Sequence, residues 1–556
     1  MIRRILVLLV WLGLVPVLSA QEVVFRHQLL SLLPDDFAVC VAMHDLRGQS
    51  ASWQSSDWFT TFRKSPLGKT LFEAPELKQF DRWQTDLKKH FDLDWPALRD
   101  DILGDNVLFV FSPGAANKRD DDHGLLLLHV ARPQQLALFI DKLNDLQKKS
   151  GELKELTPVK HKEITYFRRE RTGKTHFYLL HDSLAAISSE ESRIRSVIDK
   201  HALAVKETVW TKRFQKAAAE QAFVTMCINP REIKPDFVQA GKKDDGLPGY
   251  WQALDGIFVT FAIKDDAAVR ISIQVDTERL PKWTRSVFTQ RATPSDLWQR
   301  FPEASIVTIA GRTDIAGTMD ALKLLLPEKE RKNVGGDLQR GIGAILGLDL
   351  FKDVLPNIGP DWGGCMLPAK DAQHLPQTLI AVAVKPGTKD PPVDQSLFNA
   401  LQLFASLSIL NHNKKNPDPI LLQTMMQDKV EVKYLSNAKL FPPGLQPACA
   451  LKDGFLLLGS SPDAIRTFRK RDTKPDATEE TPLLRVSTRE LAKLLRQRED
   501  EIVTNLQQRH AMPDREAKQN LQSVTSLLDM FERVTISQNA EAGQANWTLR
   551  LTPARK

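Results

Sequence analysis

The chain has 556 residues, of which 42% are hydrophobic and 26% are charged, and its formal net charge is +7. These proportions are ordinary for a globular protein. Acidic and basic residues are interspersed along the sequence, so the mild positive charge excludes the strongly basic face expected of a nucleic-acid binder.

Residues 1–20 predict a signal peptide. Arg3 and Arg4 precede the apolar run Ile5–Leu18, which is too short to span a bilayer, and Leu18–Ala20 ends in small residues typical of a cleavage site. No cysteine stands at this boundary to accept a lipid, and no later apolar run is long enough for a transmembrane span. We therefore expect an exported protein, periplasmic or extracellular, with a mature charge of about +5 (74 − 69).

The first half of the mature chain mixes strands with helices. After Pro34, the segment Phe37–Ala42 predicts a strand and is followed by a helical region. Val107–Phe111 and Leu125–Val130 are nearly continuous apolar runs and predict two paired, central strands. An amphipathic helix is predicted from Pro133, because leucines and other apolar residues then recur at helical spacing.

The rest of this half adds short strands and one more helix. Strands are predicted at Ile164–Phe167, Phe177–Leu180, Leu184–Ser188 and Phe223–Ile228, a helix runs through Ile194 and Ile198, and a closing hairpin joins Ile257–Ile263 to Ala268–Val275. Asn229 follows the fourth of these strands with Glu232 three positions later, which predicts a capped helix start.

A junction at Asp276–Arg300 separates this pattern from its recurrence after Pro302. The corresponding segments are Ser305–Ala310, Gly364–Leu367, Leu379–Val384, the capped junction Leu484–Glu490, and the hairpin of Val534–Gln538 with Trp547–Leu551. Asp94 and Asp349 stand at matching places in the two halves, where we expect each to cap a helical segment.

Several spacings indicate an internal duplication. The segment HDSLAAISSEESRIR (His181 to Arg195) aligns without gaps on KDGFLLLGSSPDAIR (Lys452 to Arg466). The separation between partners is 268 at Pro34/Pro302, 255 at Gly104/Gly359, 268 at Glu163/Glu431, 271 at Asp182/Asp453 and 258 at Arg231/Arg489. Loop insertions supply such drift at little cost in free energy.

The sequence thus predicts an α+β protein with two tandem homologous domains, each a largely antiparallel sheet with packed helices. After the signal peptide at 1–20, the first copy is predicted at 21–290 and the second at 291–556.

A basic strip in the first copy is the candidate binding site. Its members are predicted to share a hairpin and to attract an anionic surface: Lys160, Lys162, Arg168, Arg169, Arg171 and Lys174. The alternative is a solvated edge hairpin whose charges prevent aggregation. Only scattered lysines, Lys429, Lys433 and Lys439, stand in the second copy.

Other polar clusters have plain structural interpretations. Asp120, Asp121, Asp122 and His123 form the densest group of metal-ligand types, but their spacing fits neither a calcium loop nor a zinc site, and the second copy offers only Lys370, Asp371 and His374. We therefore expect a solvated hairpin tip and predict no metal and no cofactor. Gly104-Asp105 and Gly359-Pro360-Asp361 are predicted to be tight turns.

Four cysteines, Cys40, Cys227, Cys365 and Cys449, lie in apolar, strand-like stretches without CxxC spacing. Buried free thiols are the favoured interpretation. The alternative is that the cysteines form disulfides, as is common in exported proteins.

The signal peptide, the strand after Pro34, the Leu-Asp to Gly spacing, the LLLLHV strand and the FYLLHDSLAAISS segment together resemble a family of exported bacterial proteins of unknown function with two tandem α+β copies. The resemblance covers nearly all of the mature chain. It implies the fold and supplies no catalytic residues.

No constellation of residues forms a catalytic motif, so a non-enzymatic function is favoured over an enzymatic one. The leading hypothesis is an exported, non-enzymatic binding or structural protein of the cell envelope, whose partner is a protein, a glycan or an anionic surface. The alternative is a hydrolase-like enzyme with a site at the domain junction that draws on Asp105, Asp361 or His181. Attachment to a surface through the basic strip would weaken as the salt concentration rises.

Overall fold

The fold is described from a computed structural model of the chain. It describes residues 28–48, 57–65, 68–69, 72–73, 75–103, 106–114, 122–202, 207–217, 222–233, 247–263, 266–280, 282–289, 293–313, 347–371, 373–388, 390–471 and 480–554. The predicted signal peptide lies outside these residues, as do Gly104, Asp105, Asp120 and Asp121.

The chain folds into two compact units. Unit 1 contains residues 1–243, 248–280 and 543–550, and unit 2 contains residues 244–247, 281–542 and 551–556. Each unit mixes helices with a sheet in which every described register is antiparallel, so the chain is an α+β protein.

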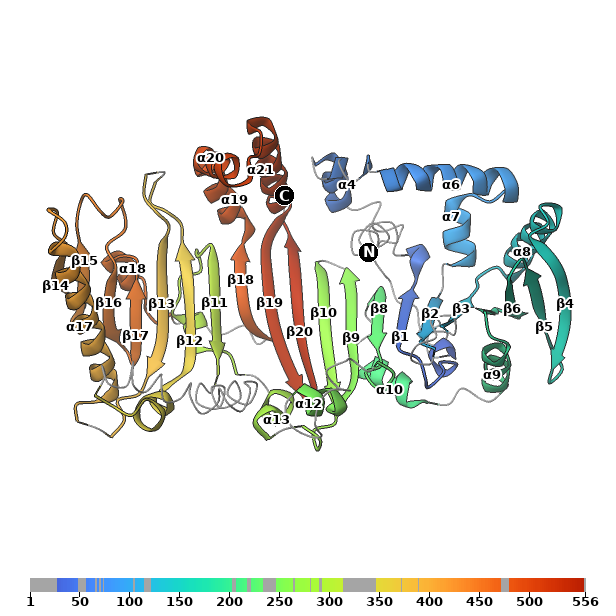
Figure 1. Ribbon diagram of the computed structural model, residues 1–556, viewed down its shortest axis with the longest axis horizontal. Coiled ribbons are helices and arrows are strands. Elements are labelled where there is room, and N and C mark those ends of the chain that lie inside the picture. Colours follow the sequence, from blue (N-terminus) through green and yellow to red (C-terminus); the bar gives the residue numbers. More distant parts are fainter. Residues whose placement is uncertain are drawn as a thin grey trace. The chain divides into compact units, whose positions relative to one another are not determined.

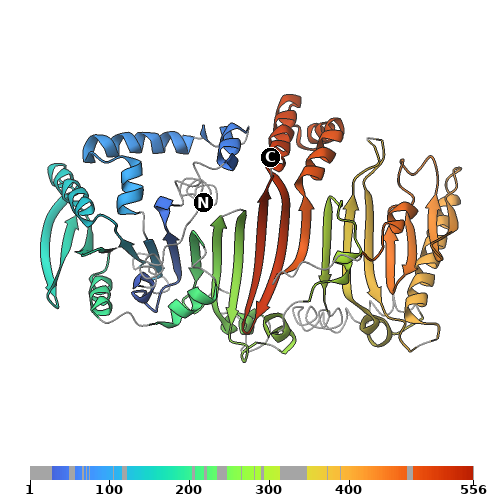
Figure 2. The same ribbon diagram turned by 180° about the vertical axis from the view of Figure 1, so that it is seen from behind.

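The sheet of unit 1 can be followed in Figure 1 and, from behind, in Figure 2. Its strands are β1 (Val39–His44), β2 (Asn106–Ser112), β3 (His123–His129), β4 (Leu153–His161), β5 (Ile164–Arg171), β6 (Lys174–His181), β7 (Leu184–Ser188), β8 (Val224–Ile228), β9 (Leu254–Ile263) and β10 (Ala267–Val275). Their order in the sheet is β4-β5-β6-β7-β3-β2-β1-β8-β9-β10.

The helices of unit 1 are α4 (Asp57–Lys64), α6 (Pro75–Phe91), α7 (Trp95–Ala97), η1 (Leu98–Ile102), α8 (Pro133–Lys149), α9 (Glu191–His201), α10 (Val209–Lys216) and α12 (Leu247–Ala253). The core on one face of the sheet contains Ile194 and Ile198 of α9 together with Tyr166. The core on the other face contains Leu136 and Ile140 of α8. Helices therefore cover this sheet on both faces.

A strand from the other end of the chain completes unit 1. β20 (Gln544–Pro553) pairs with β10. The backbone N–H of Val275 donates to the carbonyl of Gly543 (2.9 Å), and the Arg550 side chain donates to Asp266 (2.8 Å). Without these residues, β10 would be an edge strand of the unit.

Unit 2 contains the strands β11 (Val307–Arg312), β12 (Ile358–Leu367), β13 (Gln377–Val384), β14 (Leu421–Gln427), β15 (Val430–Ser436), β16 (Ala448–Lys452), β17 (Phe455–Gly459), β18 (Thr481–Ser487) and β19 (Phe531–Glu541). Their order is β14-β15-β16-β17-β13-β12-β11-β18-β19, which repeats the order from β4 to β9 in unit 1.

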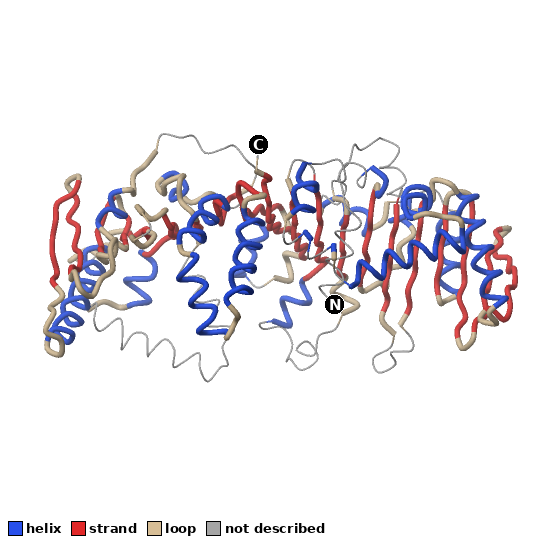
Figure 3. Tube along the Cα trace, turned by 90° about the horizontal axis from the view of Figure 1, so that it is seen from above, coloured by secondary structure: helices blue, strands red, loops and turns tan. Residues whose placement is uncertain are grey.

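The helices of unit 2 are α13 (Lys282–Thr289), η4 (Asp296–Gln299), η6 (Leu350–Val354), η7 (Leu355–Asn357), α17 (Val393–Asn413), α18 (Pro462–Arg466), α19 (Thr488–Gln497), α20 (Glu499–His510) and α21 (Asp514–Leu528). The main core combines Phe301, Leu457, Ile465 and Phe468. Figure 3 shows the helices of each unit lying beside its strands.

The strand registers reproduce most of the separations predicted from the sequence. Ala42 pairs with Leu108 in unit 1, and Ala310 pairs with Gly363 in unit 2. The corresponding separations are 268 (310 − 42) and 255 (363 − 108). Two further separations also match, 271 for Ala186 and Leu457 (457 − 186) and 258 for Cys227 and Arg485 (485 − 227).

One predicted correspondence is wrong by two residues. The sequence aligns Glu163–Tyr166 with Glu431–Tyr434, but Tyr166 pairs with Leu179, and it is Val432 that pairs with the matching residue Ala450. The separation is therefore 266 (432 − 166). Because side chains alternate with a period of two along a strand, a two-residue shift keeps the same inside and outside pattern, and the sequence does not reveal it.

The predicted helix caps form at Asp94, where the side chain accepts from Ala97 N (2.9 Å), and at Asp349, which accepts from Phe351 N and Lys352 N. Ser487 caps α19, but its own N–H pairs with Ile306, so Glu490 does not complete a capping box. Asn229 begins a turn, and residues 234–246 are not described.

Gly359-Pro360-Asp361 is not the predicted tight turn. It lies inside β12, at a register shift between Ile358 and Trp362, and Gly359 has a φ of 90°. A glycine suits this conformation because it has no Cβ.

Candidate functional site

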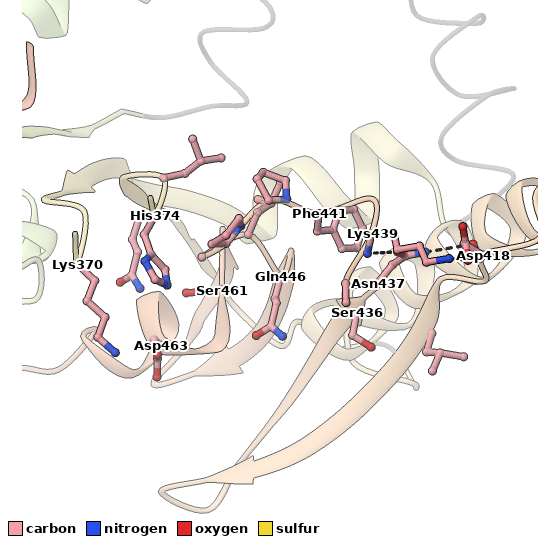
Figure 4. A pocket seen from close by; sticks show the side chains of 18 of the residues that line it. Lys370, His374, Asp418, Ser436, Asn437, Lys439, Phe441, Gln446, Ser461 and Asp463 are labelled. Atoms are coloured by element: carbon pink, nitrogen blue, oxygen red, sulfur yellow. Dashed lines mark hydrogen bonds and ion pairs between the residues drawn. The ribbon is translucent and has the colours of Figure 1, made fainter. Parts of the chain in front are cut away.

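A polar cleft lies in unit 2. Its volume is about 760 Å³, and Figure 4 shows its lining side chains. Three loops surround it: one before β13 contributes Lys370 and His374, one between α17 and β14 contributes Asp418, and residues 437–446 come from the connection between β15 and β16.

The β15–β16 connection, which we call the cleft loop (residues 437–447), is held in place by Asn437. The Asn437 side-chain amide donates to the carbonyls of Asp418 and Pro419 (3.1 Å each). Its oxygen accepts from the backbone N–H groups of Lys439 and Leu440 (2.9 and 2.8 Å). The loop is therefore ordered by its own hydrogen bonds before any ligand arrives.

His374, in the loop before β13, is held by Asp371. Its Nδ1 lies 2.6 Å from Oδ1 of Asp371, which also accepts from the backbone N–H groups of Gln373 and His374. The hydrogen bond from His374, followed by the backbone bonds, lowers the pKa of Asp371. Gly444 passes close to the imidazole, because a Cβ at this position would lie 3.3 Å from His374 Cδ2.

The charges around the cleft are of both signs. Lys439 pairs with Asp418 (2.8 Å), and Asp463 pairs with Arg466 (3.0 Å). Ser461 lines the cleft with only 5% of its surface exposed, and its hydroxyl accepts from the backbone N–H of Ala464. Amides, hydroxyls and balanced charges give the cleft many hydrogen-bonding groups without a strong net charge.

The residues of the predicted basic strip are not confined to one hairpin: they lie on the three successive strands β4, β5 and β6 and on the turn between β4 and β5. The register also divides them between the two faces of the sheet. Lys160, Arg169, Arg171 and Lys174 belong to the face of Phe167, whereas Arg168 belongs to the face of Tyr166. The basic side chains are therefore spread around an edge of the sheet.

Several of these cations also have acidic or polar neighbours. Lys162 pairs with Asp199 (2.6 Å), Arg168 with Glu170 (2.5 Å) and Arg171 with Glu152 (3.0 Å), and Arg169 donates to Gln147. Such pairs reduce the local positive charge that an anionic surface would meet.

The residues proposed for a hydrolase have local partners. Asp361 is buried in unit 2, where its carboxylate accepts from the backbone N–H of Asp296 (3.2 Å). His181 belongs to unit 1, with Asp182 at 3.7 Å and the ring of His201 beside it. Asp105 lies outside the described residues.

The acidic loop is described only from Asp122, whose carboxylate accepts from Gly114 N, and His123 pairs with Glu190 (2.9 Å). Among the described residues, no three His, Cys, Asp or Glu side chains are grouped so that they could hold a metal ion.

All four cysteines are free thiols, as favoured by the sequence. Cys40 and Cys227 stand opposite each other on β1 and β8, and burial raises the pKa of both. Burial also raises the pKa values of Cys365 and Cys449 to about 11.

The sequence alone does not locate the cleft. Its polar residues Lys370, Asp371, His374 and Lys439 are visible in the sequence, but nothing there brings them together. A usable signal was the segment FPPGLQP (Phe441 to Pro447), whose prolines and glycine mark an irregular loop where unit 1 has only a short turn at 172–173.

No helix in the described part of the chain has both the length and the apolar character to cross a membrane. Comparison with known protein families found no family model that matches the chain, and comparison with curated proteins found no similar protein.

Proposed function

We propose that this chain is an exported, non-enzymatic binding protein of the cell envelope, built from two homologous copies at 21–290 and 291–556, and that its second copy binds a glycan in the polar cleft. The matching strand orders and register separations of the two units support the duplication. The signal peptide predicted at residues 1–20 supports the location.

The observation that carries the proposal is that the cleft loop replaces a short turn. At the corresponding place in the strand order, β5 and β6 are joined by residues 172–173 alone, whereas residues 437–447 join β15 and β16. This loop supplies Phe441, Asn437 and Gln446 to the cleft. Amide groups suit the hydroxyls of a sugar, and an aromatic ring suits its C–H face.

One observation favours the enzyme alternative within the same cleft. The Asp371–His374 pair resembles the hydrogen-bonded carboxylate and imidazole of a serine hydrolase, and a serine, Ser461, also lines the cleft. However, the described residues provide no hydrogen bond between Ser461 and His374, and the Ser461 hydroxyl instead caps α18. The binding proposal therefore has the stronger support.

A glycan array probed with the purified protein tests the proposal, followed by calorimetry on any glycan that binds. We expect Gln446→Ala and His374→Ala to weaken binding by about tenfold each, because each removes a polar group from the cleft wall. Lys429→Ala, on the β14–β15 turn away from the cleft lining, is the matched control and should leave binding unchanged.

The proposal fails if no glycan binds, or if the cleft variants and the control bind equally well. Release of shorter glycans during incubation, abolished by His374→Ala, would establish the hydrolase alternative instead.

A further inference from the structure

Helix α17 has an unusual distribution of apolar residues. Only its first turns are buried, through Val393, Ser396 and Phe398, and residues 399–413 contain no buried side chain. Yet Phe404 and Leu407 in this part are 65% and 57% exposed. A surface helix normally turns its apolar side chains toward the core, so these exposed apolar side chains suit an apolar ligand.

A groove of about 520 Å³ lies between α17 and the strands β14 to β17. Its two walls are apolar: Leu401, Phe404 and Ile409 come from the helix, and Leu422, Leu435 and Leu458 come from the sheet. This volume lies within the range of about 300–1,000 Å³ that is typical of small-molecule sites.

Among the polar residues that line the groove are His412 from α17 and Lys433 from β15. The Asn416 side-chain amide lies 3.2 Å from Nδ1 of His412 and also donates to the His412 carbonyl (2.9 Å). Lys433 Nζ contacts Glu431 (2.5 Å) and Thr424 (3.0 Å). Because an ammonium has three N–H groups, one remains for a ligand.

We propose that this groove binds one long-chain fatty acid. The acyl chain lies between α17 and the sheet, and the carboxylate accepts hydrogen bonds from His412 and Lys433. The two facing apolar walls favour a single acyl chain, and the N–H group of Lys433 that Glu431 and Thr424 leave unused favours a carboxylate as its hydrogen-bond acceptor. The site is separate from the glycan cleft and does not depend on the proposed function.

Calorimetric titration of the full chain with sodium octanoate, decanoate, laurate and palmitate, each below its micelle concentration, tests the proposal. Each added methylene should tighten binding by about fourfold until the groove is full, because each buries further apolar surface. Methyl palmitate should bind more weakly than palmitate, because it lacks the carboxylate.

Two serines on α17 provide matched variants. Ser408 lines the groove and Ser406 does not, and both are exposed, so neither substitution disturbs a buried position. Ser408→Trp should fill the groove and weaken palmitate binding by at least about tenfold, whereas Ser406→Trp should leave it unchanged.

A charge variant tests the head-group contact. Lys433→Met should weaken palmitate binding by about tenfold and leave methyl palmitate unaffected, because only the carboxylate meets the ammonium. Lys429→Met is the control for the loss of one positive charge.

Equal binding by the two tryptophan variants, binding that is independent of chain length, or the absence of saturable binding would each overturn the proposal. So would a stable dimer that Ser406→Trp and Ser408→Trp both disrupt and that palmitate does not affect, because the apolar surface would then bind a second copy of the chain.

Discussion

Tyr166 connects the core of unit 1 to its surface. The residue is fully buried, but its hydroxyl donates to the carboxylate of Glu191 on α9, and Arg195 contacts both groups. The hydrogen bond from Tyr166 is the main cause that lowers the pKa of Glu191, and the pKa of Tyr166 is raised, first by desolvation. The Tyr166 hydroxyl thus links β5 to α9 in addition to the core contacts of Ile194 and Ile198.

We predict that Tyr166→Phe lowers the free energy of unfolding by about 1 kcal/mol at pH 7. Because the pKa of Glu191 is lowered in the folded state, its contribution is present above the unfolded value of about 4.3 and is lost as the pH falls through the folded pKa. The difference between the variant and the parent should therefore shrink below about pH 4. Urea unfolding of both proteins at pH 7 and at pH 3.5 measures this difference in the free energy of unfolding.

Tyr434→Phe is the control, since the described residues provide no side-chain hydrogen bond to Tyr434. Its stability should match the parent at both pH values. A Tyr166→Phe variant whose loss is the same at pH 7 and pH 3.5 would contradict the role of the Glu191 carboxylate.

At the scale of elements, α8 and α17 occupy the same place in the strand order but pack differently. Each follows the third strand of its unit and precedes the fourth. Ile140 of α8 is only 7% exposed, whereas Leu407 of α17 lies at the surface. The same element is thus part of the core in unit 1 and one wall of an open groove in unit 2.

We predict that Ile140→Ala lowers the free energy of unfolding by about 2–5 kcal/mol, because it leaves a cavity in a packed core. Leu407→Ala should change it by no more than about 0.5 kcal/mol, because the side chain is exposed. Thermal or urea unfolding of the two variants in parallel makes the comparison. A large loss for Leu407→Ala would show that α17 is already covered in the free protein.

The sequence predicted the apolar strands, the caps at Asp94 and Asp349, and most of the register, because burial and turn chemistry depend on local residue types. It missed the edge strands β4 and β14, whose residues are mostly polar or exposed and so carry no clear alternation. It did not locate the cleft either, since that site depends on loops brought together by tertiary structure.

At the scale of the whole molecule, unit 1 depends on the end of the chain. Residues 543–550 belong to this unit, where Gly543, Thr548 and Arg550 bond to β10 or to residues near it. Residues 551–556 belong to unit 2. The two short segments therefore have separable roles.

We predict that deletion of residues 543–556 increases amide exchange throughout β10, because the strand loses its outer partner. Deletion of residues 551–556 alone should leave exchange in β10 close to that of the parent. Hydrogen–deuterium exchange, followed by mass spectrometry on peptides that cover residues 267–275, compares the two deletion variants. Equal protection of β10 in both deletions would show that its pairing with β20 adds no stability.

The β10–β20 pairing also sets an order of events during synthesis. Domains generally fold from the amino terminus as the chain emerges, but unit 1 waits for residues that are translated after all the strands β11 to β19. Until then β10 presents unpaired backbone groups to any other strand nearby. We therefore expect the sheet of unit 1 to be completed only after β20 has been synthesised, and we expect β10 to be open to mispairing until then.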